Sequence, residues 1–151
     1  MRVEDTPDWQ AWRDLRLEAL ADTPIGYGEL LADAQALTDA DWQARMQRPG
    51  IRLMAYDGER PVGMAGGFRR EDGTPVLVAV YVTPSARGGD VVGALVERVR
   101  AWCDHEPLTL DVHVDNHRAH AAYLKLGFAD TGVRTPGGGI DGRDLLEMVH
   151  P

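Results

Sequence analysis

The fold is decided near the middle of the chain by the stretch VYVTPSARGGDVVGALV, residues 80–96. Its β-branched beginning is typical of a buried strand, and Pro84 ends that strand. Arg87 and two glycines follow as a turn, and apolar side chains then recur at the spacing of an amphipathic helix. This order predicts half of a βαβ unit, with a helix N-terminus that can hold an anion.

The second half of that unit follows directly. Residues 108–114, LTLDVHV, alternate apolar and polar side chains, which predicts a strand. Asn116 is a good N-cap for the next helix, and Gly127 suits the left-handed position after its end. Three further segments complete the chain: a strand from Phe128, a glycine-rich loop over 134–144 and a last strand over 145–150.

Upstream of the stretch, the hydrophobic period changes from helical to extended. Helical spacing predicts a helix over 9–21 and a second helical stretch over 30–47, which restarts at Thr38. Three antiparallel strands follow, joined at Asp57-Gly58 and Asp72-Gly73: 51–57, 61–69 and 76–82. The third is apolar on both faces, which predicts a central strand covered on both sides.

These elements predict an α/β (α+β) fold in one domain over 1–151. We expect a central, mixed and mostly antiparallel sheet of six to seven strands, flanked by about four helices. Met1 to Val3 supply a short first strand if seven are present. The last strand is expected at an edge of the sheet, where it could pair in a homodimer.

Composition excludes several classes of protein. The 151 residues carry a formal net charge of −8 and have no basic stripe, so nucleic acid is not an expected partner. No apolar run spans a bilayer and no leader is visible, which predicts a cytoplasmic protein without a membrane partner. The single cysteine, Cys103, excludes an internal disulfide and is expected to pack in the core.

Two motifs give the chain a specific resemblance. One is V-x-P-x-x-R-G, at Val82, Pro84, Arg87 and Gly88. The other is N-x-x-A-x-x-x-Y-x-x-x-G-F, met in full by Asn116, Ala119, Tyr123, Gly127 and Phe128. With the order of elements, they resemble the GCN5-related N-acetyltransferase (GNAT) superfamily, and in particular its small, single-domain bacterial members.

The resemblance implies acetyl-CoA as co-substrate and an amine as acceptor, with direct attack of the neutral amine on the thioester. Arg87 and the helix N-terminus would hold the pyrophosphate, and Tyr123 would protonate the departing CoA thiolate. The expected cofactor-binding residues are Val80, Tyr81, Val82, Arg87, Gly88, Gly89, Asp90, Val91, Val92, Asn116 and Tyr123. Taken alone, Arg87 would be a surface arginine and Tyr123 a packed helical side chain.

The anion-binding turn departs from the family pattern at two positions. The family has R-x-x-G-x-G or R-x-x-G-x-A, whereas this chain has Asp90 and Val92 at the small-residue positions. An aspartate at a helix start bonds the N–H groups of the first turn, which are those that a pyrophosphate uses. We therefore expect Asp90 to weaken CoA binding. The coenzyme would be held mainly by Arg87 and by the backbone of the loop.

The general base and the acceptor contacts are less defined. Where many relatives have a glutamate on the central strand, this chain has Val76. His113 is a candidate catalytic base because its unperturbed pKa is near about 6.5, and Asp111 shares its strand face; a solvated face is the alternative interpretation. In the region that relatives fold over the acceptor, the candidate contacts are Tyr27, Glu29 and Asp33, and Asp111 is the fourth candidate substrate-binding residue.

The net charge and the histidines bear on the ligands to be expected. Because the chain is acidic, it weakly favours a cationic amine as the acceptor. The five histidines show one helical pair, His117 and His120, without a ligand set, so no metal site is predicted. An acyl-CoA-binding sensor or interaction module with weak or no catalysis remains the alternative function, supported by the missing strand glutamate and the altered loop.

Overall fold

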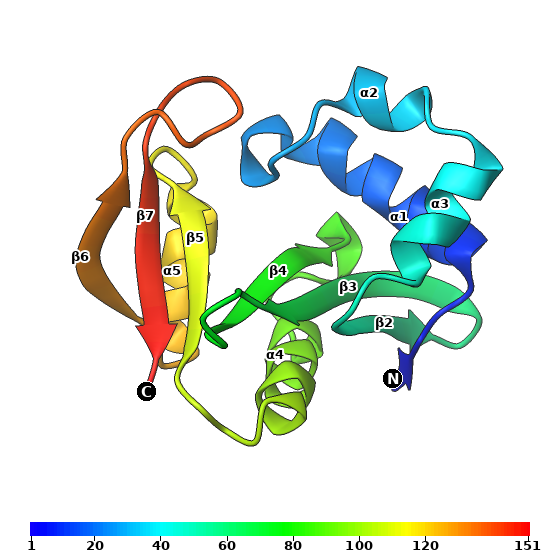
Figure 1. Cartoon of the computed structure of the whole chain (residues 1–151). Coiled ribbons are helices and arrows are strands. Elements are labelled where there is room, and N and C mark those ends of the chain that lie inside the picture. The colour runs from blue at the N-terminus through cyan, green and yellow to red at the C-terminus, as the bar shows by residue number, and fades with distance from the viewer.

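The computed structural model describes all 151 residues and contains one seven-stranded sheet (Figure 1). The strands lie in the order β1-β2-β3-β4-β5-β7-β6: β1 (Arg2–Asp5), β2 (Ile51–Asp57), β3 (Arg60–Arg69), β4 (Pro75–Val82), β5 (Leu108–His113), β6 (Ala129–Thr135) and β7 (Leu145–His150). The α-helices are α1 (Trp9–Asp22), α2 (Leu31–Gln35), α3 (Asp39–Met46), α4 (Val91–Trp102) and α5 (His117–Lys125). Two 3-10 turns, η1 (Pro24–Gly26) and η2 (Pro84–Ala86), complete the elements. The expected sheet is confirmed, with five α-helices where about four were expected.

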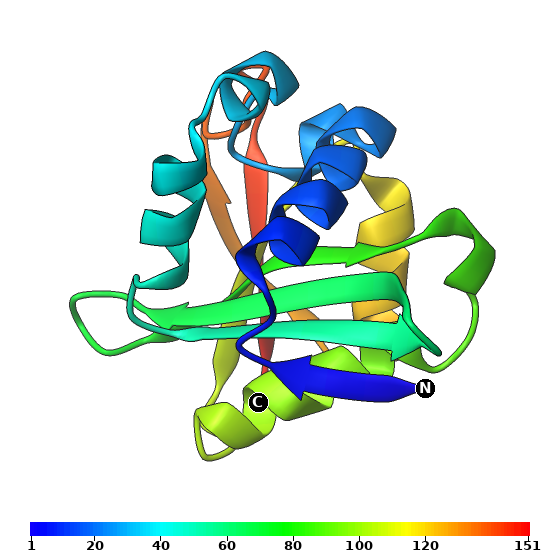
Figure 2. The same cartoon turned by 90° about the vertical axis from the view of Figure 1, so that its right-hand side faces the viewer.

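Helices cover both faces of the sheet, and this explains the unbroken apolar runs in its central strands. In β2, Leu53 and Ala55 pack into a core with α4 and α5, whereas Met54 and Tyr56 pack into a second core with α1 to α3. Figure 2 shows α1 on one side of these strands and α4 on the other. Because side chains alternate between faces, a strand buried on both sides needs apolar residues throughout.

Two glycines of β3 bring α4 close to the sheet. A Cβ added at Gly63 would lie 2.8 Å from Cγ1 of Val91, and one at Gly67 would lie 3.0 Å from the ring of Trp102. The absence of side chains there lets both ends of α4 pack against β3. The helix N-terminus is thereby fixed beside the end of β4.

The predicted helix boundaries are confirmed where side chains set them. Thr38 and Asp41 form a reciprocal capping box, which explains the restart that separates α3 from α2. The side chain of Asn116 accepts a hydrogen bond from the N–H of Ala119 at the start of α5. Gly127, after the end of α5, has φ 97°, as its left-handed role requires.

Two expectations about strands were wrong. The strand Leu145–His150 is not at an edge, because β7 lies between β5 and β6, and it therefore has no free edge for a partner. β4 is not covered along both faces either, since Val78 is exposed where β4 and β5 separate. Separately, none of the helices is long and apolar enough to cross a membrane.

Candidate functional site

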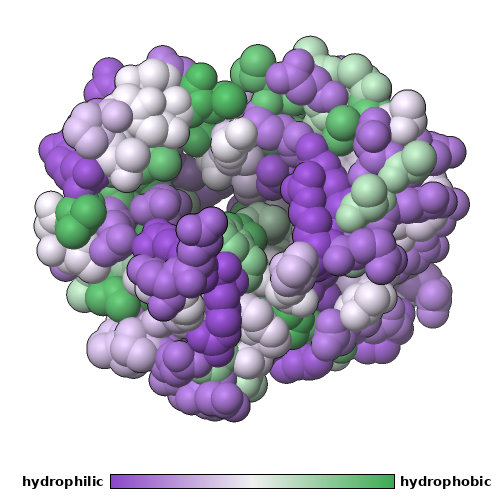
Figure 3. Space-filling model, in the orientation of Figure 1, coloured by the Kyte–Doolittle hydropathy of each residue, from purple (hydrophilic) through white to green (hydrophobic).

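A hollow opens where two neighbouring strands diverge. β4 and β5 are parallel, but they share a single bridge, between Val76 and Thr109. Figure 3 shows the hollow between the two halves of the molecule. Two cavities of about 580 and 390 Å³ occupy this region, and we call them the larger and the smaller cavity. Six residues line both: Gly26, Tyr27, Val80, Asp111, His113 and Tyr123.

β4 carries a bulge at this opening. Its register against β3 shifts between Met64 and Gly66, and Ala79 has φ 56°. A non-glycine residue in the left-handed region is strained, and such strain concentrates at functional sites. The bulge leaves Val80 without a register partner, and its carbonyl instead accepts a hydrogen bond from the Tyr27 hydroxyl at 2.8 Å. This bulge could not be predicted from the sequence, because alanine is not a residue that favours positive φ.

The larger cavity contains most of the predicted cofactor contacts. Nine of the eleven expected residues line it: Val80, Tyr81, Val82, Arg87, Gly88, Gly89, Val92, Asn116 and Tyr123. Arg118 and Lys125 also line it and were missed. They are seven residues apart on α5, a helical spacing that could have placed them on one face. With Arg87, they give this cavity three cationic side chains.

Arg87 is held in place at the cavity wall. Its Nε donates to the Val82 carbonyl at 3.0 Å, and Nη2 donates to Asp22 at 2.7 Å. Its guanidinium also lies 5.6 Å from the ring centroid of Tyr81. Hydrogen bonds from Thr23 and then Arg87 lower the pKa of Asp22, so this carboxylate remains charged beside the arginine. Arg87 therefore has a fixed orientation that a mobile surface arginine would lack.

Asp90 does not behave as expected. It stands at the N-cap of α4 but makes no side-chain capping hydrogen bond, and its backbone is in the right-handed helical region. Neither Asp90 nor Val91 lines the larger cavity, and Asp90 is exposed. The extended backbone that N-cap side chains need is absent here, so the carboxylate does not occupy the N–H groups of the first turn. Direct competition with an anion at those groups is therefore not supported.

Tyr123 and Tyr27 meet where the two cavities join. The ring of Tyr123 packs edge-on against Phe128, with centroids 5.6 Å apart, and its hydroxyl makes no hydrogen bond. Burial, with a smaller contribution from Tyr27, raises the pKa of Tyr123, so its hydroxyl stays protonated at neutral pH. Because the Tyr27 hydroxyl already donates to Val80, Tyr123 has the unengaged hydroxyl of the pair.

The smaller cavity is built from segments far apart in the sequence. Asp111 lines it from β5, and Gly138 to Ile140 line it from the glycine-rich loop. Burial raises the pKa of Asp111 despite the opposing effect of Arg70. A carboxylate with a raised pKa is a better proton acceptor, and Asp111 lines both cavities.

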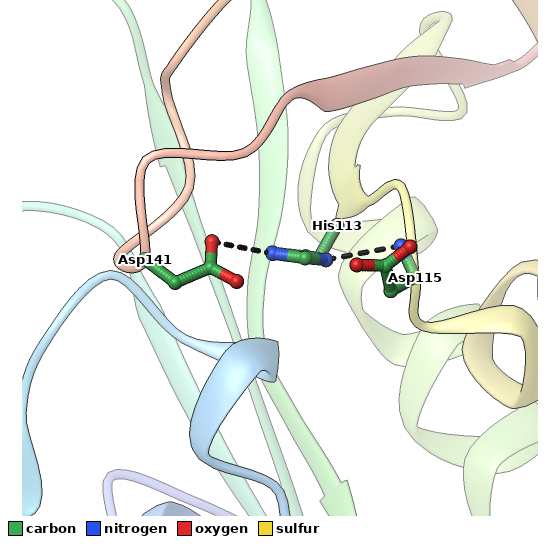
Figure 4. Close-up of side chains that lie close together, drawn as sticks. All are labelled: His113, Asp115 and Asp141. Atoms are coloured by element: carbon green, nitrogen blue, oxygen red, sulfur yellow. Dashed lines mark hydrogen bonds and ion pairs between the residues drawn. The ribbon is translucent and has the colours of Figure 1, made fainter.

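His113 is a buried imidazole with both ring nitrogens engaged (Figure 4). Its side chain is 0% exposed, and Nε2 lies 2.8 Å from Oδ1 of Asp141. The backbone N–H of Asp115 donates to Nδ1 at 3.0 Å. Since Nδ1 accepts, the neutral ring carries its proton on Nε2 and donates to Asp141. This leaves no free nitrogen for an incoming proton, and the geometry favours a role in fixing the glycine-rich loop.

His113, Asp115 and Asp141 form the one group of potential metal ligands in the structure. The ligand atoms of His113, Asp115 and Asp141 lie within 4.8 Å of one another. However, the two carboxylates flank the imidazole on opposite sides rather than converging on one point (Figure 4). Asp115 is also paired with Arg143 at 2.8 Å. The donor set is that of a hydrogen-bonded loop anchor, and it does not fit the convergent geometry of a metal centre.

Two of the predicted acceptor contacts lie elsewhere. Glu29 is bound by two arginines: Nε of Arg16 lies 3.0 Å from its Oε1, and Nη2 of Arg45 lies 2.6 Å from its Oε2. The hydrogen bond from Arg45 is the main cause of its lowered pKa. Glu29 lines neither cavity, and Asp33 lies on an exposed part of α2 outside both. Arg16, which the sequence did not single out, takes their place in the smaller cavity.

The fold has many solved counterparts that act on different acceptors. A ribosomal-protein-alanine N-acetyltransferase from Brucella melitensis is 23% identical, with 99% of this chain and 98% of that one covered at a TM-score of 0.76. A phosphinothricin acetyltransferase from Sinorhizobium meliloti, solved with acetyl-CoA, is 18% identical, with 99% and 87% covered at 0.78. An aminoglycoside 6'-acetyltransferase type Ii is 18% identical, with 99% and 96% covered at 0.72. Among curated proteins, no sequence matches significantly.

The family itself is shown by sequence. The model of the acetyltransferase (GNAT) family matches residues 9–128, which include both motifs and the strands that open to form the two cavities. This chain therefore belongs to the GNAT acetyltransferase family.

Proposed function

We propose that this acetyltransferase binds acetyl-CoA in the larger cavity and transfers the acetyl group to a primary amine in the smaller one. The observation that carries the proposal is that the two cavities meet at Tyr123 and Asp111. One side chain there is a protonated hydroxyl without a partner, and the other is a carboxylate with a raised pKa. An acid and a base at one junction are what this transfer needs.

The larger cavity fits the charge and shape of CoA. Arg87, Arg118 and Lys125 would face its phosphates, and the N–H groups of Gly88 and Gly89 lie at the N-terminal end of α4. Gly88 has φ 82°, a conformation that glycine adopts at little cost. The diverging edge of β4 at Val80 and Val82 would bind the pantetheine arm through backbone groups. Bound acetyl-CoA supplies a thioester carbonyl as the electrophile.

The transfer balances with the side chains at the junction. The neutral amine attacks the acetyl carbonyl, a C–N bond forms and the C–S bond breaks. Asp111 takes the proton that the amine nitrogen loses, and Tyr123 gives its proton to the sulfur. Both groups then return to their starting states by exchange with water. His113 acts as a positioning residue, because its hydrogen bond to Asp141 holds the loop that covers the amine.

The proposal is tested by following free thiol when the protein is incubated with acetyl-CoA and a panel of primary amines. We expect amine-dependent thiol release, and Tyr123→Phe is expected to lower kcat by about 10²–10⁴-fold. Tyr56→Phe is the matched control, because this buried tyrosine lies in the core of the α1 side and lines neither cavity.

Two outcomes would contradict the proposal. One is CoA binding by calorimetry without thiol release from any amine, which would favour a sensor module. The other is full activity in Tyr123→Phe, which would remove the tyrosine from the reaction.

A further inference from the structure

The wall of the smaller cavity formed by α1 presents a positive charge. Arg16 lines the cavity with a side chain that is only 15% exposed. Its Nε is bonded to Glu29, and its guanidinium lies 4.8 Å from the ring centroid of Tyr27, but its two terminal nitrogens make no hydrogen bond. A largely buried guanidinium with unused donors is suited to an anionic group.

The charge of Arg16 is not cancelled by its neighbours. Both oxygens of Glu29 accept from Arg45, at 3.0 and 2.6 Å, and Arg45 does not line the cavity. The three side chains together carry one surplus positive charge. Of the two arginines, only Arg16 lines the cavity, so the surplus is available to a bound molecule.

The wall formed by β5 has the opposite sign. Asp111 and Glu147 are direct partners across β5 and β7. Arg70 lies 3.9 Å from each carboxylate, beyond hydrogen-bond distance. These three groups together carry one surplus negative charge. Asp111 and Arg70 line the smaller cavity and Glu147 does not, and of the three only Asp111 also lines the larger cavity, so the negative charge faces the junction. Between the walls, the lining is largely apolar: Ile25, Phe68, Val78, Ala79, Leu110 and Ile140.

We propose that the acceptor is an amine that also carries an acid group on an apolar body, such as an apolar amino acid, with its amine at Asp111 and its acid group at Arg16. The inference rests on the proposed function, because it identifies the acceptor of that reaction. A cavity with one positive and one negative wall matches a zwitterion and offers no excess negative charge for a polycation. The weak preference for a cationic acceptor, drawn from the net charge of the whole chain, therefore does not extend to this cavity.

The test compares amines with and without an acid group. Thiol release from acetyl-CoA is measured with L-leucine and 6-aminohexanoate, with leucinamide and hexylamine as their counterparts without the acid group, and with spermidine. We expect kcat/KM for an acid-bearing amine to exceed that of its acid-free counterpart by about tenfold or more. Equal or faster turnover of the acid-free amines or spermidine overturns the inference while the proposed function stands. Absence of release from all five, with CoA bound, instead overturns the proposed function.

Variants separate an anchor from a structural arginine. Arg16→Gln should bring the ratio of kcat/KM for acid-bearing amines to kcat/KM for acid-free amines close to one, and Arg16→Lys should retain part of the preference. Arg13→Gln is the matched control, because this arginine is also on α1, pairs with Asp14 and Asp39 rather than Glu29, and lines neither cavity. If Arg13→Gln abolishes the preference as completely as Arg16→Gln does, the effect is not specific to Arg16 and the anchor is refuted.

Discussion

The two cavities that meet at Tyr123 are assembled from the chain in different ways. The larger one is lined mainly by two short segments, 80–92 and 116–126, that also carry the two sequence motifs. The smaller one collects residues from α1, η1, β3, β4, β5 and the glycine-rich loop. The difference teaches that a cofactor shared by a family leaves a local sequence pattern, whereas an acceptor site is distributed and is visible only in the fold.

After Tyr123→Phe, the largest effect is expected from the second residue at the boundary between the cavities. Asp111→Asn should lower kcat by about ten- to a hundredfold, because the amine loses its proton acceptor, while CoA affinity changes little. Wild-type activity should fall on the acid side, where Asp111 becomes protonated through its raised pKa. Rate profiles against pH check this, and a variant with full activity and an unchanged acidic limb would show that Asp111 is not the base.

Loss of activity in Asp111→Asn should not reflect unfolding. Burial raises the pKa of Asp111 in the folded protein, so its contribution to stability is present at low pH and is lost as the pH rises through that pKa. At neutral pH, the asparagine variant should therefore be at least as stable as the wild type, as melting curves can show.

The second effect concerns stability, and it tests the ion pairs that hold Arg16 in the wall of the smaller cavity. Glu29→Gln should reduce the free energy of unfolding at pH 7 by about 1–3 kcal/mol, because two largely buried arginines lose their carboxylate. The pKa of Glu29 is lowered, so this stability is present above the unfolded pKa of about 4.3 and is lost as the pH falls. Urea unfolding should show that the difference in the free energy of unfolding between wild type and variant becomes smaller at acid pH. Glu97→Gln, in an exposed pair with Arg100, should change stability far less.

A smaller effect distinguishes His113 from a base. His113→Asn should raise KM for the amine by about three- to tenfold and loosen the glycine-rich loop, seen as faster amide hydrogen exchange, with CoA affinity unchanged. Asp141→Asn should be milder, since its amide oxygen can still accept from His113. If the acidic limb of the rate profile disappeared in His113→Asn and persisted in Asp111→Asn, the two roles would be reversed.

The smallest effect belongs to the cofactor side. Asp90→Asn should tighten CoA binding by no more than about threefold at low ionic strength, because the exposed carboxylate acts only at a distance. Calorimetry at two salt concentrations measures this, with Asp104→Asn beyond the far end of α4 as the control. A tenfold or larger gain would restore direct competition at the helix N-terminus.

The sequence was most informative where local physics sets structure. Caps such as Thr38 and Asn116, and the left-handed Gly127, fixed element boundaries that the fold confirms. The strand order around β7 was missed, because the position of a strand in a sheet depends on long-range pairing. The bulge at Ala79 was missed for a related reason, since no local signal marks a strain that the surrounding sheet imposes.

Some residues of the site could be predicted from the sequence and others could not, again because only local patterns are visible in a sequence. Arg87 and Tyr123 lie in contiguous motifs, so they were found. In the sequence, Arg16 is one more charged residue on a helix. Only the fold places it in the same cavity as Asp111. Glu29 lies in the expected loop, but its partners decide its role, and both are remote in sequence: Arg16 by 13 residues and Arg45 by 16.

The most direct test of the account is a crystal structure of the protein with CoA. We predict the pyrophosphate at the N–H groups of Gly88 and Gly89, and the sulfur at the junction of the two cavities, about 3–4 Å from the Tyr123 hydroxyl. A CoA molecule whose sulfur lies away from Tyr123, or whose pyrophosphate lies outside the larger cavity, would contradict the account.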